Sequence, residues 1–192
     1  MSDSRDREDR SSHIKSLKAK IRSHIWNLME QKDIADFPRP VTGRIPNFKG
    51  SSIACEKAFN MREIVEVSTL KIDPDSPLKT ARLKALLSGK TVVMPTPRLR
   101  RGFLVLDGKL IPSWRAVEAS TIRGAFKYGQ IVENPYELPS IDAMIVGCVA
   151  VSRINGVRIG KGGGYSDLEL SLIHISEPTR PLYISYAVFC LK

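Results

Sequence analysis

A glycine-rich segment in the last quarter of the chain carries the residues best suited to bind phosphate. It reads RIGKGGGYSD over residues 158–167, and four of the five positions 160–164 are glycine. Glycine lets the backbone approach a ligand closely and turn successive N–H groups toward one anion. Arg158 and Lys161 add positive charge, and Asp167 supplies a carboxylate of the kind that holds Mg²⁺ beside nucleotide oxygens. A cluster of glycines also occurs as a plain flexible turn, so the pattern alone leaves both interpretations open.

The spacing of this segment differs from that of two common nucleotide loops. GKGGGYS lacks the G-x-x-x-x-G-K-[ST] order, and the expected domain ends before the acidic residue of a dinucleotide fingerprint could follow. The segment comes after residues 141–151, an apolar run interrupted only by Asp142 and Gly147. Such a run is typical of a strand buried on both faces of a parallel sheet. A glycine loop at the C-terminal end of a parallel strand is a favourable place for phosphate.

A second group of basic residues lies on the first predicted helix, over residues 14–29. Apolar residues recur there at steps of three and four and form one stripe, at Ile14, Leu17, Ile21, Ile25 and Leu28. Lys18 and Arg22 are four residues apart and therefore flank that stripe on one side. From the pattern alone, a solvated basic edge is the simpler interpretation of this pair.

The rest of the chain predicts alternating helices and strands, which indicates an α/β fold. In chain order we expect an ordered loop over 35–50, helices over 55–59 and 61–63, a strand of alternating exposure over 66–72, a helix over 77–88 capped by Gly89, strands over 91–94 and 103–106, a hairpin return over 109–111, and irregular chain over 120–124 and 130–139.

Composition narrows the class of protein. The 192 residues fit one domain, with 30 basic and 20 acidic residues and a net charge of +10. The basic residues are spread along the chain without finger spacing or an aromatic ribonucleoprotein motif, which favours a small polyanion over nucleic acid. Three widely separated cysteines indicate a reducing, cytoplasmic setting, with Cys148 as a buried structural thiol. No apolar run is long enough to span a membrane.

The two ends of the chain are expected to lie outside the domain. Residues 1–13 alternate acids and arginines and are expected to form a disordered arm. From about Leu170 the chain reads LSLIHISEPTR, which resembles the in-frame translation of an adapter used to build DNA sequencing libraries. We therefore expect a domain over 14–169 and a foreign tail over 170–192. The alternative is a genuine apolar strand over 183–191.

Two separated motifs resemble those of one enzyme family. Residues 158–167 are similar to the pattern R-x-G-[RK]-G-x-G-Y followed by an aspartate, and residues 18–22, KAKIR, are similar to K-x-x-[LI]-R. Between them come Asp73 after an extended segment, then a helix, Gly89-Lys90, a short apolar strand and Pro95, in the family's order. Over about residues 15–169 the chain resembles the 5-formyltetrahydrofolate cyclo-ligase family.

The resemblance implies a fold, a reaction and a set of site residues. The fold would be a Rossmann-like, mostly parallel sheet flanked by helices and incomplete at its C-terminus. The reaction would be the ATP- and Mg²⁺-dependent conversion of 5-formyltetrahydrofolate to 5,10-methenyltetrahydrofolate, with a reduced folate as the substrate. The implied residues are Lys18, Arg22 and Tyr165 for catalysis, Arg158, Gly160, Lys161, Gly162, Gly163 and Gly164 for the nucleotide, Asp73 and Ser166 for the folate, and Asp167 for the metal.

One position departs from the family pattern. Ser166 stands where cyclo-ligases usually have a second tyrosine, so an aromatic contact to the folate is missing.

The segments ADFPRPVTGRIPNFKG, PTPRLRRGF and RIGKGGGYSDLE resemble a divergent branch of the family in which the domain is fused to an RNA-recognition motif. The alternative function is therefore an inactive nucleotide- or RNA-associated member, with RNA bound through a module absent from this chain. A domain whose glycine loop is only structural is the third interpretation.

Overall fold

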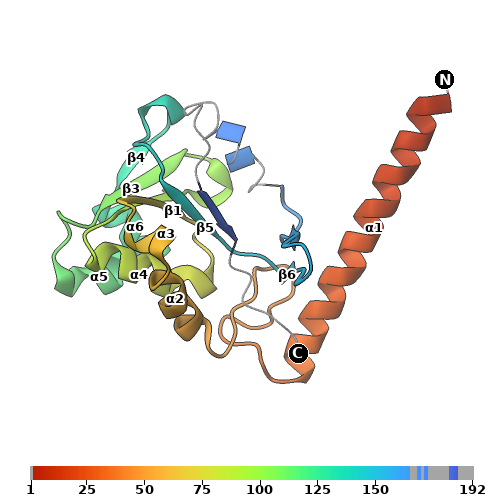
Figure 1. Ribbon diagram of the computed structural model, residues 1–192, viewed down its shortest axis with the longest axis horizontal. Coiled ribbons are helices and arrows are strands. Elements are labelled where there is room, and N and C mark those ends of the chain that lie inside the picture. Colours follow the sequence, from red (N-terminus) through yellow and green to blue (C-terminus); the bar gives the residue numbers. More distant parts are fainter. Residues whose placement is uncertain (1, 165–167, 170, 173–181, 186–192) are drawn as a thin grey trace.

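A six-stranded, mostly parallel sheet forms the centre of the molecule. The computed structural model describes residues 2–164, 168–169, 171–172 and 182–185 (Figure 1). The order across the sheet is β4 (Gln130–Val132), β3 (Phe103–Asp107), β2 (Thr91–Pro95), β1 (Thr69–Ile72), β5 (Ala143–Val146) and β8 (Leu182–Ser185). Strands β2, β1, β5 and β8 run parallel to one another, whereas β3 pairs antiparallel with both β2 and β4. The predicted α/β class with a mostly parallel sheet is confirmed.

Helices cover one face of this sheet and enclose the main core. Leu70 and Ile72 of β1 point into it with alternate residues of β2, β3 and β5. All four residues of β1 are buried, so the predicted alternation of exposure was wrong: a central parallel strand is covered on both faces. The covering elements are α2 (Ser51–Phe59), α3 (Arg62–Val65), α4 (Lys79–Leu87), α5 (Ala116–Ala119) and α6 (Ile122–Tyr128). The chain also has four short 3-10 turns among the described residues: η1 (Ser76–Leu78), η2 (Pro97–Leu99), η3 (Ser113–Arg115) and η4 (Pro135–Glu137).

The opposite face of the sheet has a smaller apolar cluster that contains one charge. Val93 of β2 and Met144 of β5 are buried there, with Leu172 packed against the cluster. Lys71 pairs in register with both of these residues and is fully buried between them. A lysine therefore occupies the central position of an otherwise apolar row, and it needs anionic partners to remain there.

Helix α1 (Ser2–Gln31) stands apart from the sheet, with its N-terminal half extending beyond the domain (Figure 1). Only its last turns pack, through Trp26 and Met29, against the ordered loop that follows and against Val149. The predicted apolar stripe is present, but Ile14, Leu17 and Ile21 are 42–50% exposed. The helix also includes residues 2–13, for which a disordered arm was expected, and no glycine or proline interrupts this stretch.

Three other expectations differ from the structure. No strand forms over 109–111, because β3 already pairs with β2 and β4 on its two edges. The segments expected to be irregular contain α6 and β4. The long apolar run over 141–151 divides into β5 and β6 (Ala150–Val151), and β6 pairs with β7 (Arg158–Ile159) in a separate two-stranded sheet.

Strand β8 lies within the segment that was expected to be foreign. It pairs in parallel with β5, from Ala143 opposite Leu182 to Val146 opposite Ser185. This placement agrees with the alternative interpretation of the tail as a strand, although residues 186–192 of that interpretation lie outside the described part of the chain. The adapter hypothesis stays a prediction, and the native transcript tests it.

Candidate functional site

A cavity of about 1000 Å³ opens at the C-terminal ends of β1 and β2. This is the end of a parallel sheet at which α/β proteins bind their ligands. Every sequence-predicted site residue that the structure describes lines this cavity. They are Lys18, Arg22, Asp73, Arg158, Gly160, Lys161, Gly162, Gly163 and Gly164. Tyr165, Ser166 and Asp167 lie outside the described residues.

The first helix and the glycine segment meet directly in the cavity wall. The Nε–H of Arg22 donates to the carbonyl oxygen of Gly160 at 2.7 Å. Gly162 has a φ of 98°, and a Cβ added there would lie 3.2 Å from Cζ of Arg22. Position 162 therefore favours glycine for its left-handed backbone, and a Cβ there would also displace the guanidinium of Arg22 slightly. The solvated edge suggested by the sequence pattern is, at Arg22, a contact between two distant motifs.

The turn after β1 also contacts the glycine segment. Nζ of Lys161 lies 3.2 Å from Oδ1 of Asp75. Burial raises the pKa of the Asp75 carboxyl, and the charge of Lys161 opposes that change. The turn itself is fixed by Arg82, which is buried and donates to the carbonyl oxygens of Asp73 at 2.5 Å and Asp75 at 3.2 Å. Burial lowers the pKa of Arg82 to about 10, so it stays protonated at neutral pH.

A buried ion cluster closes the floor of the cavity. The ammonium of Lys71 contacts the carboxylates of both Asp73 and Glu169, and all three side chains are buried. Oδ2 of Asp73 also accepts from the backbone N–H of Gly147 at 3.3 Å. Burial acts to lower the pKa of Lys71, but the two carboxylates outweigh it and raise that pKa. For the Glu169 carboxyl, burial has the opposite effect and raises the pKa to about 7, although the charge of Lys71 acts to lower it.

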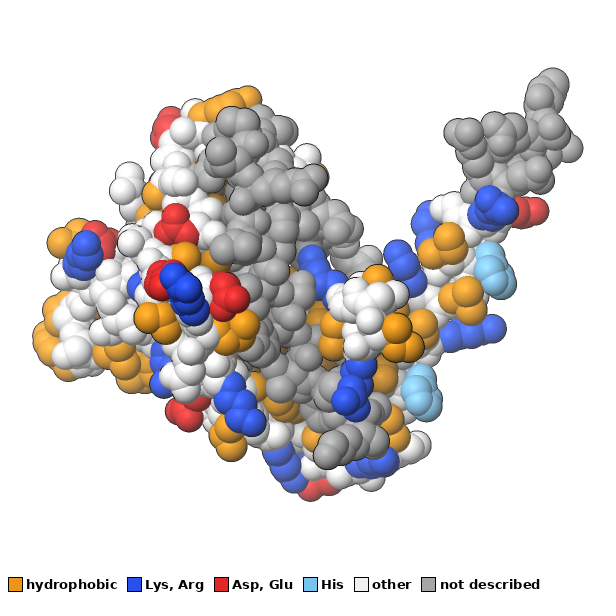
Figure 2. Space-filling model, viewed as in Figure 1, with side chains coloured by type: hydrophobic (Ala, Val, Ile, Leu, Met, Phe, Trp, Pro, Cys, Tyr) orange, Lys and Arg blue, Asp and Glu red, His pale blue; other side chains and the backbone are white. Residues whose placement is uncertain are grey.

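The charges around the cavity leave an excess of unpaired cations. Each of its three acids, Asp73, Asp75 and Glu169, forms an ion pair with a lysine. Five basic side chains of the wall make no hydrogen bond or ion pair to another described residue: Lys15, Lys18, Arg44, Arg98 and Arg158. Figure 2 shows basic side chains along α1 and on the domain face beside it. The arrangement favours a ligand that carries several negative charges.

Comparison with known proteins agrees with the two motifs that meet at Arg22 and Gly160. The model of the 5-formyltetrahydrofolate cyclo-ligase family matches residues 14–188. The chain belongs to this family. It is 43% identical over 164 residues to the human (Homo sapiens) methenyltetrahydrofolate synthase domain-containing protein, and 39% identical over 158 residues to the Danio rerio protein of the same name. The alignments cover 81% and 80% of this chain but only 41% and 40% of those relatives, so the chain spans about two fifths of their length.

The cyclo-ligase family depends on ATP, which suits a cavity with surplus positive charge. Within the described residues, no group of three or more His, Cys, Asp or Glu side chains could hold a metal ion. None of the described helices is long and apolar enough to cross a membrane.

Sequence reasoning missed several residues that shape this cavity. Asp75 could have been found from its place two residues after Asp73, at the end of a predicted strand. Lys71, Arg82 and Glu169 gave no such signal, because an isolated charged residue in a strand or helix normally faces solvent. Asp73 was predicted to bind the folate, but the structure commits its two carboxylate oxygens to Lys71 and Gly147.

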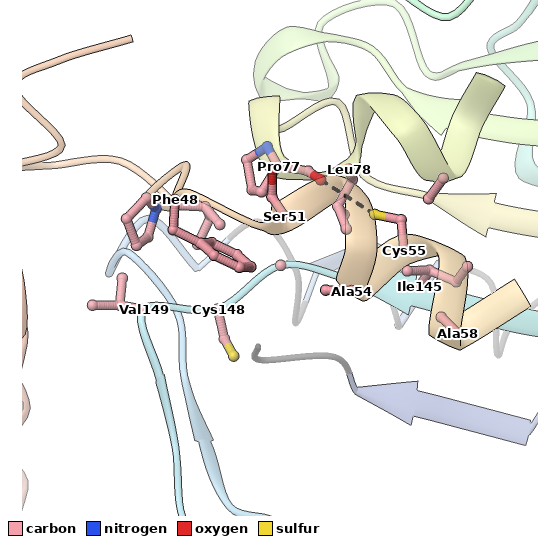
Figure 3. Close-up of a pocket in the computed structure, with 14 residues that line it drawn as sticks. Phe48, Ser51, Ala54, Cys55, Ala58, Pro77, Leu78, Ile145, Cys148 and Val149 are labelled. Atoms are coloured by element: carbon pink, nitrogen blue, oxygen red, sulfur yellow. Dashed lines mark hydrogen bonds between the residues drawn. The ribbon is translucent and has the colours of Figure 1, made fainter. Parts of the chain in front are cut away.

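A second, much smaller cavity of about 30 Å³ lies beside the first, with Ile45 lining both. Its wall is mainly apolar, as Figure 3 shows for Phe48, Leu78 and Ile145. Burial raises the pKa of the neighbouring Cys148 thiol to about 11, so Cys148 is uncharged at neutral pH. The volume is close to that of one water molecule. The prediction that Cys148 is a buried thiol is confirmed.

Proposed function

We propose that this chain binds ATP in the large cavity and converts 5-formyltetrahydrofolate to 5,10-methenyltetrahydrofolate. The observation that carries the proposal is the hydrogen bond from Arg22 to Gly160, which joins the two family motifs across the cavity. The unpartnered cations of the same wall supply the charge that a triphosphate requires. Folate as the substrate follows from membership of the family.

Each part of the wall has a distinct task in this proposal. Lys18 and Arg158 have side chains without a described partner, and they would neutralise phosphate oxygens. Arg22 and Lys161 already contact Gly160 and Asp75, so they fix the shape of the glycine segment and add charge. The backbone N–H groups of residues 160–164 would complete the phosphate site.

The reaction needs positioning more than covalent help from the protein. The γ-phosphoryl group is transferred to the formyl oxygen, and ADP leaves. The neighbouring folate nitrogen then attacks the activated carbon, and phosphate departs with the formyl oxygen. Tyr165 and Ser166 are assigned to the folate, and Asp73 to the floor beneath it.

In this proposal a magnesium ion is held by Asp167, which lies outside the described residues, and by the nucleotide. Asp73 and Glu169 are bound to Lys71, so they are not available to a cation. One carboxylate together with phosphate oxygens is a usual set of Mg²⁺ ligands. The ion would neutralise charge on the transferred phosphoryl group.

The test is the absorbance of the methenyl product in a mixture of protein, ATP, Mg²⁺ and 5-formyltetrahydrofolate. Growth of the product band that requires ATP is expected. ATP binding by calorimetry without any product would instead favour the second candidate, an inactive nucleotide- or RNA-associated member of the family. Ser166, in place of the second tyrosine, is the observation that keeps this candidate open.

A further inference from the structure

The loop after β2 holds two consecutive non-glycine residues in the left-handed backbone region. Arg98 has φ 57° and ψ 24°, and Leu99 has φ 53°. Residues with side chains avoid this region, and they remain in it only where the surrounding structure holds them. Such residues cluster at ligand-binding sites, and Arg98 lines the large cavity.

Thr96 holds the loop closed on itself. Its side chain is 3% exposed, donates to the carbonyl oxygen of Gly102 at 2.9 Å and accepts from the N–H of Arg101 at 3.1 Å. Its own carbonyl oxygen accepts from the N–H of Leu99 at 2.8 Å. The backbone of Arg98 is therefore fixed from both sides, although the side chain itself is exposed.

The position of Arg98 separates it from the phosphate-binding residues. In the sheet order, β2 and β5 flank β1 on opposite sides. Arg98 follows β2, whereas the glycine segment follows β5 and the small β6–β7 sheet. Both line the same cavity, and the turn after β1 with Asp73 and Asp75 lies between them.

Charge divides the cavity between these two sides. The floor holds three carboxylates (Asp73, Asp75 and Glu169) against three cations (Lys71, Lys161 and Arg82), and so carries no net charge when all are ionised. A neutral floor offers no excess positive charge to hold one polyanion across it, in contrast to the unpartnered cations of the walls. The cavity volume of about 1000 Å³ is at the upper end of the range for a single small-molecule site, which leaves room for a second ligand.

We propose that Arg98 binds the carboxylate end of the second substrate and determines specificity for a ligand that carries it. The inference rests on the proposed function, in which that ligand is a reduced folate with a glutamate at one end. A guanidinium matches the planar fork of a carboxylate, and no described residue pairs with that of Arg98. The held backbone aims this single arginine at the cavity from the side that the nucleotide does not use.

Arg98→Gly is the variant that separates binding from folding. Glycine adopts the backbone of position 98 without strain, so the variant should be at least as stable as the parent protein. Arg100→Ala is the matched control, because Arg100 is exposed on the same loop but does not line the cavity. The thermal midpoint of each variant reports its folding.

Binding is then measured by calorimetry with three ligands: ATP, 5-formyltetrahydrofolate, and the primary amide of 5-formyltetrahydropteroate, which lacks the glutamate and carries no free carboxylate. Arg98→Gly should weaken 5-formyltetrahydrofolate about 10- to 100-fold, the range for a hydrogen bond to a charged group. The affinities for ATP and for the pteroate amide should stay within about twofold, as should all three affinities of Arg100→Ala.

Three results would overturn the inference. They are an unchanged folate affinity in Arg98→Gly, an equal loss for folate and the pteroate amide, and a loss confined to ATP. Failure of the proposed function is visible earlier and separately. In that case the unsubstituted protein binds ATP but neither pterin ligand, and the role of Arg98 falls with it.

Discussion

Two sets of contacts hold the glycine segment, and they differ in their surroundings. On its N-terminal side, Arg22 and Asp75 contact Gly160 and Lys161 at the partly exposed cavity wall. On its C-terminal side, Glu169 is bound to Lys71 inside the core. Partly exposed ion pairs contribute little to stability, whereas removal of one partner from a buried pair leaves an uncompensated charge. Contacts at the N-terminal end of the glycine segment are therefore expected to contribute little to stability, whereas the contact at its C-terminal end is expected to contribute much.

The largest effect is expected from breaking the buried end. Lys71→Met leaves the carboxylates of Asp73 and Glu169 buried without their shared cation, and should lower the free energy of unfolding by about 3–5 kcal/mol. Urea unfolding followed by circular dichroism measures it. Lys79→Met, at an exposed lysine without a described partner, is the control and should change little. A loss below about 1 kcal/mol for Lys71→Met would contradict the assignment of a structural role to the buried cluster.

The glycine segment itself should show the next largest effect, on ligand affinity. Gly162→Val places a β-carbon against Arg22 at a φ of 98°, and distorts the backbone that faces the phosphates. The loss of ATP affinity should exceed the roughly 1–3 kcal/mol of one charged hydrogen bond. Gly160→Ala is the matched control, because an added Cβ there meets no atom within 4 Å. If both variants bind ATP as tightly as the unsubstituted protein in calorimetry, the segment is only a turn.

The N-terminal end of the glycine segment should respond in binding more than in folding. Lys161→Met removes the partly exposed pair with Asp75 and one of the proposed phosphate contacts. We expect a loss of about 1–3 kcal/mol in ATP binding and a change below about 1 kcal/mol in the free energy of unfolding. Arg153→Gln, on an exposed arginine outside the cavity, serves as the reference. If Lys161→Met instead unfolds the protein as readily as Lys71→Met, the two ends do not differ.

The smallest effect concerns the folate side of the loop. Ser166→Tyr restores the aromatic residue that the family pattern has at this position. An aromatic contact is worth about 0.5–1.5 kcal/mol beyond area burial, so the folate affinity or turnover should improve by up to about tenfold. The rate of methenyl formation against 5-formyltetrahydrofolate concentration measures both. No product from either protein while ATP still binds would end the enzyme hypothesis.

The sequence predicted the elements that are marked by periodicity and by glycine or proline. The first helix, the parallel strands β2 and β5 and the cap at Gly89, with a φ of 69°, follow from such signals. The two motifs were also located in advance, because glycine clusters and paired basic residues are local features. Their meeting in one cavity followed only from the resemblance to the family.

The buried ion cluster could not be predicted in this way. Whether Lys71 faces solvent or the core depends on which strands flank β1 and on the segment that covers its second face. Strand β4 and helix α6 were missed for a related reason: each is short, and its type is decided by the partner it packs against. The hairpin expected after Asp107 failed because the pairing edge of β3 was already taken by β4.

The tail gives a separate test of sequence reasoning. If residues from about Leu170 derive from an adapter, the native transcript will diverge there and continue with domain-like sequence. A native transcript that encodes LSLIHISEPTR would establish the strand interpretation, with β8 as part of the natural sheet.

The bond from Arg22 to Gly160 spans 138 residues and has a consequence for synthesis. The ribosome releases the first helix long before the glycine segment exists, so the nucleotide site cannot form until most of the domain has emerged. Contacts of such high sequence separation also form late in refolding, after loop closure has been completed elsewhere. Nucleotide binding by a nascent or refolding chain should therefore appear as the last event. The time at which binding appears would then report when the fold is complete.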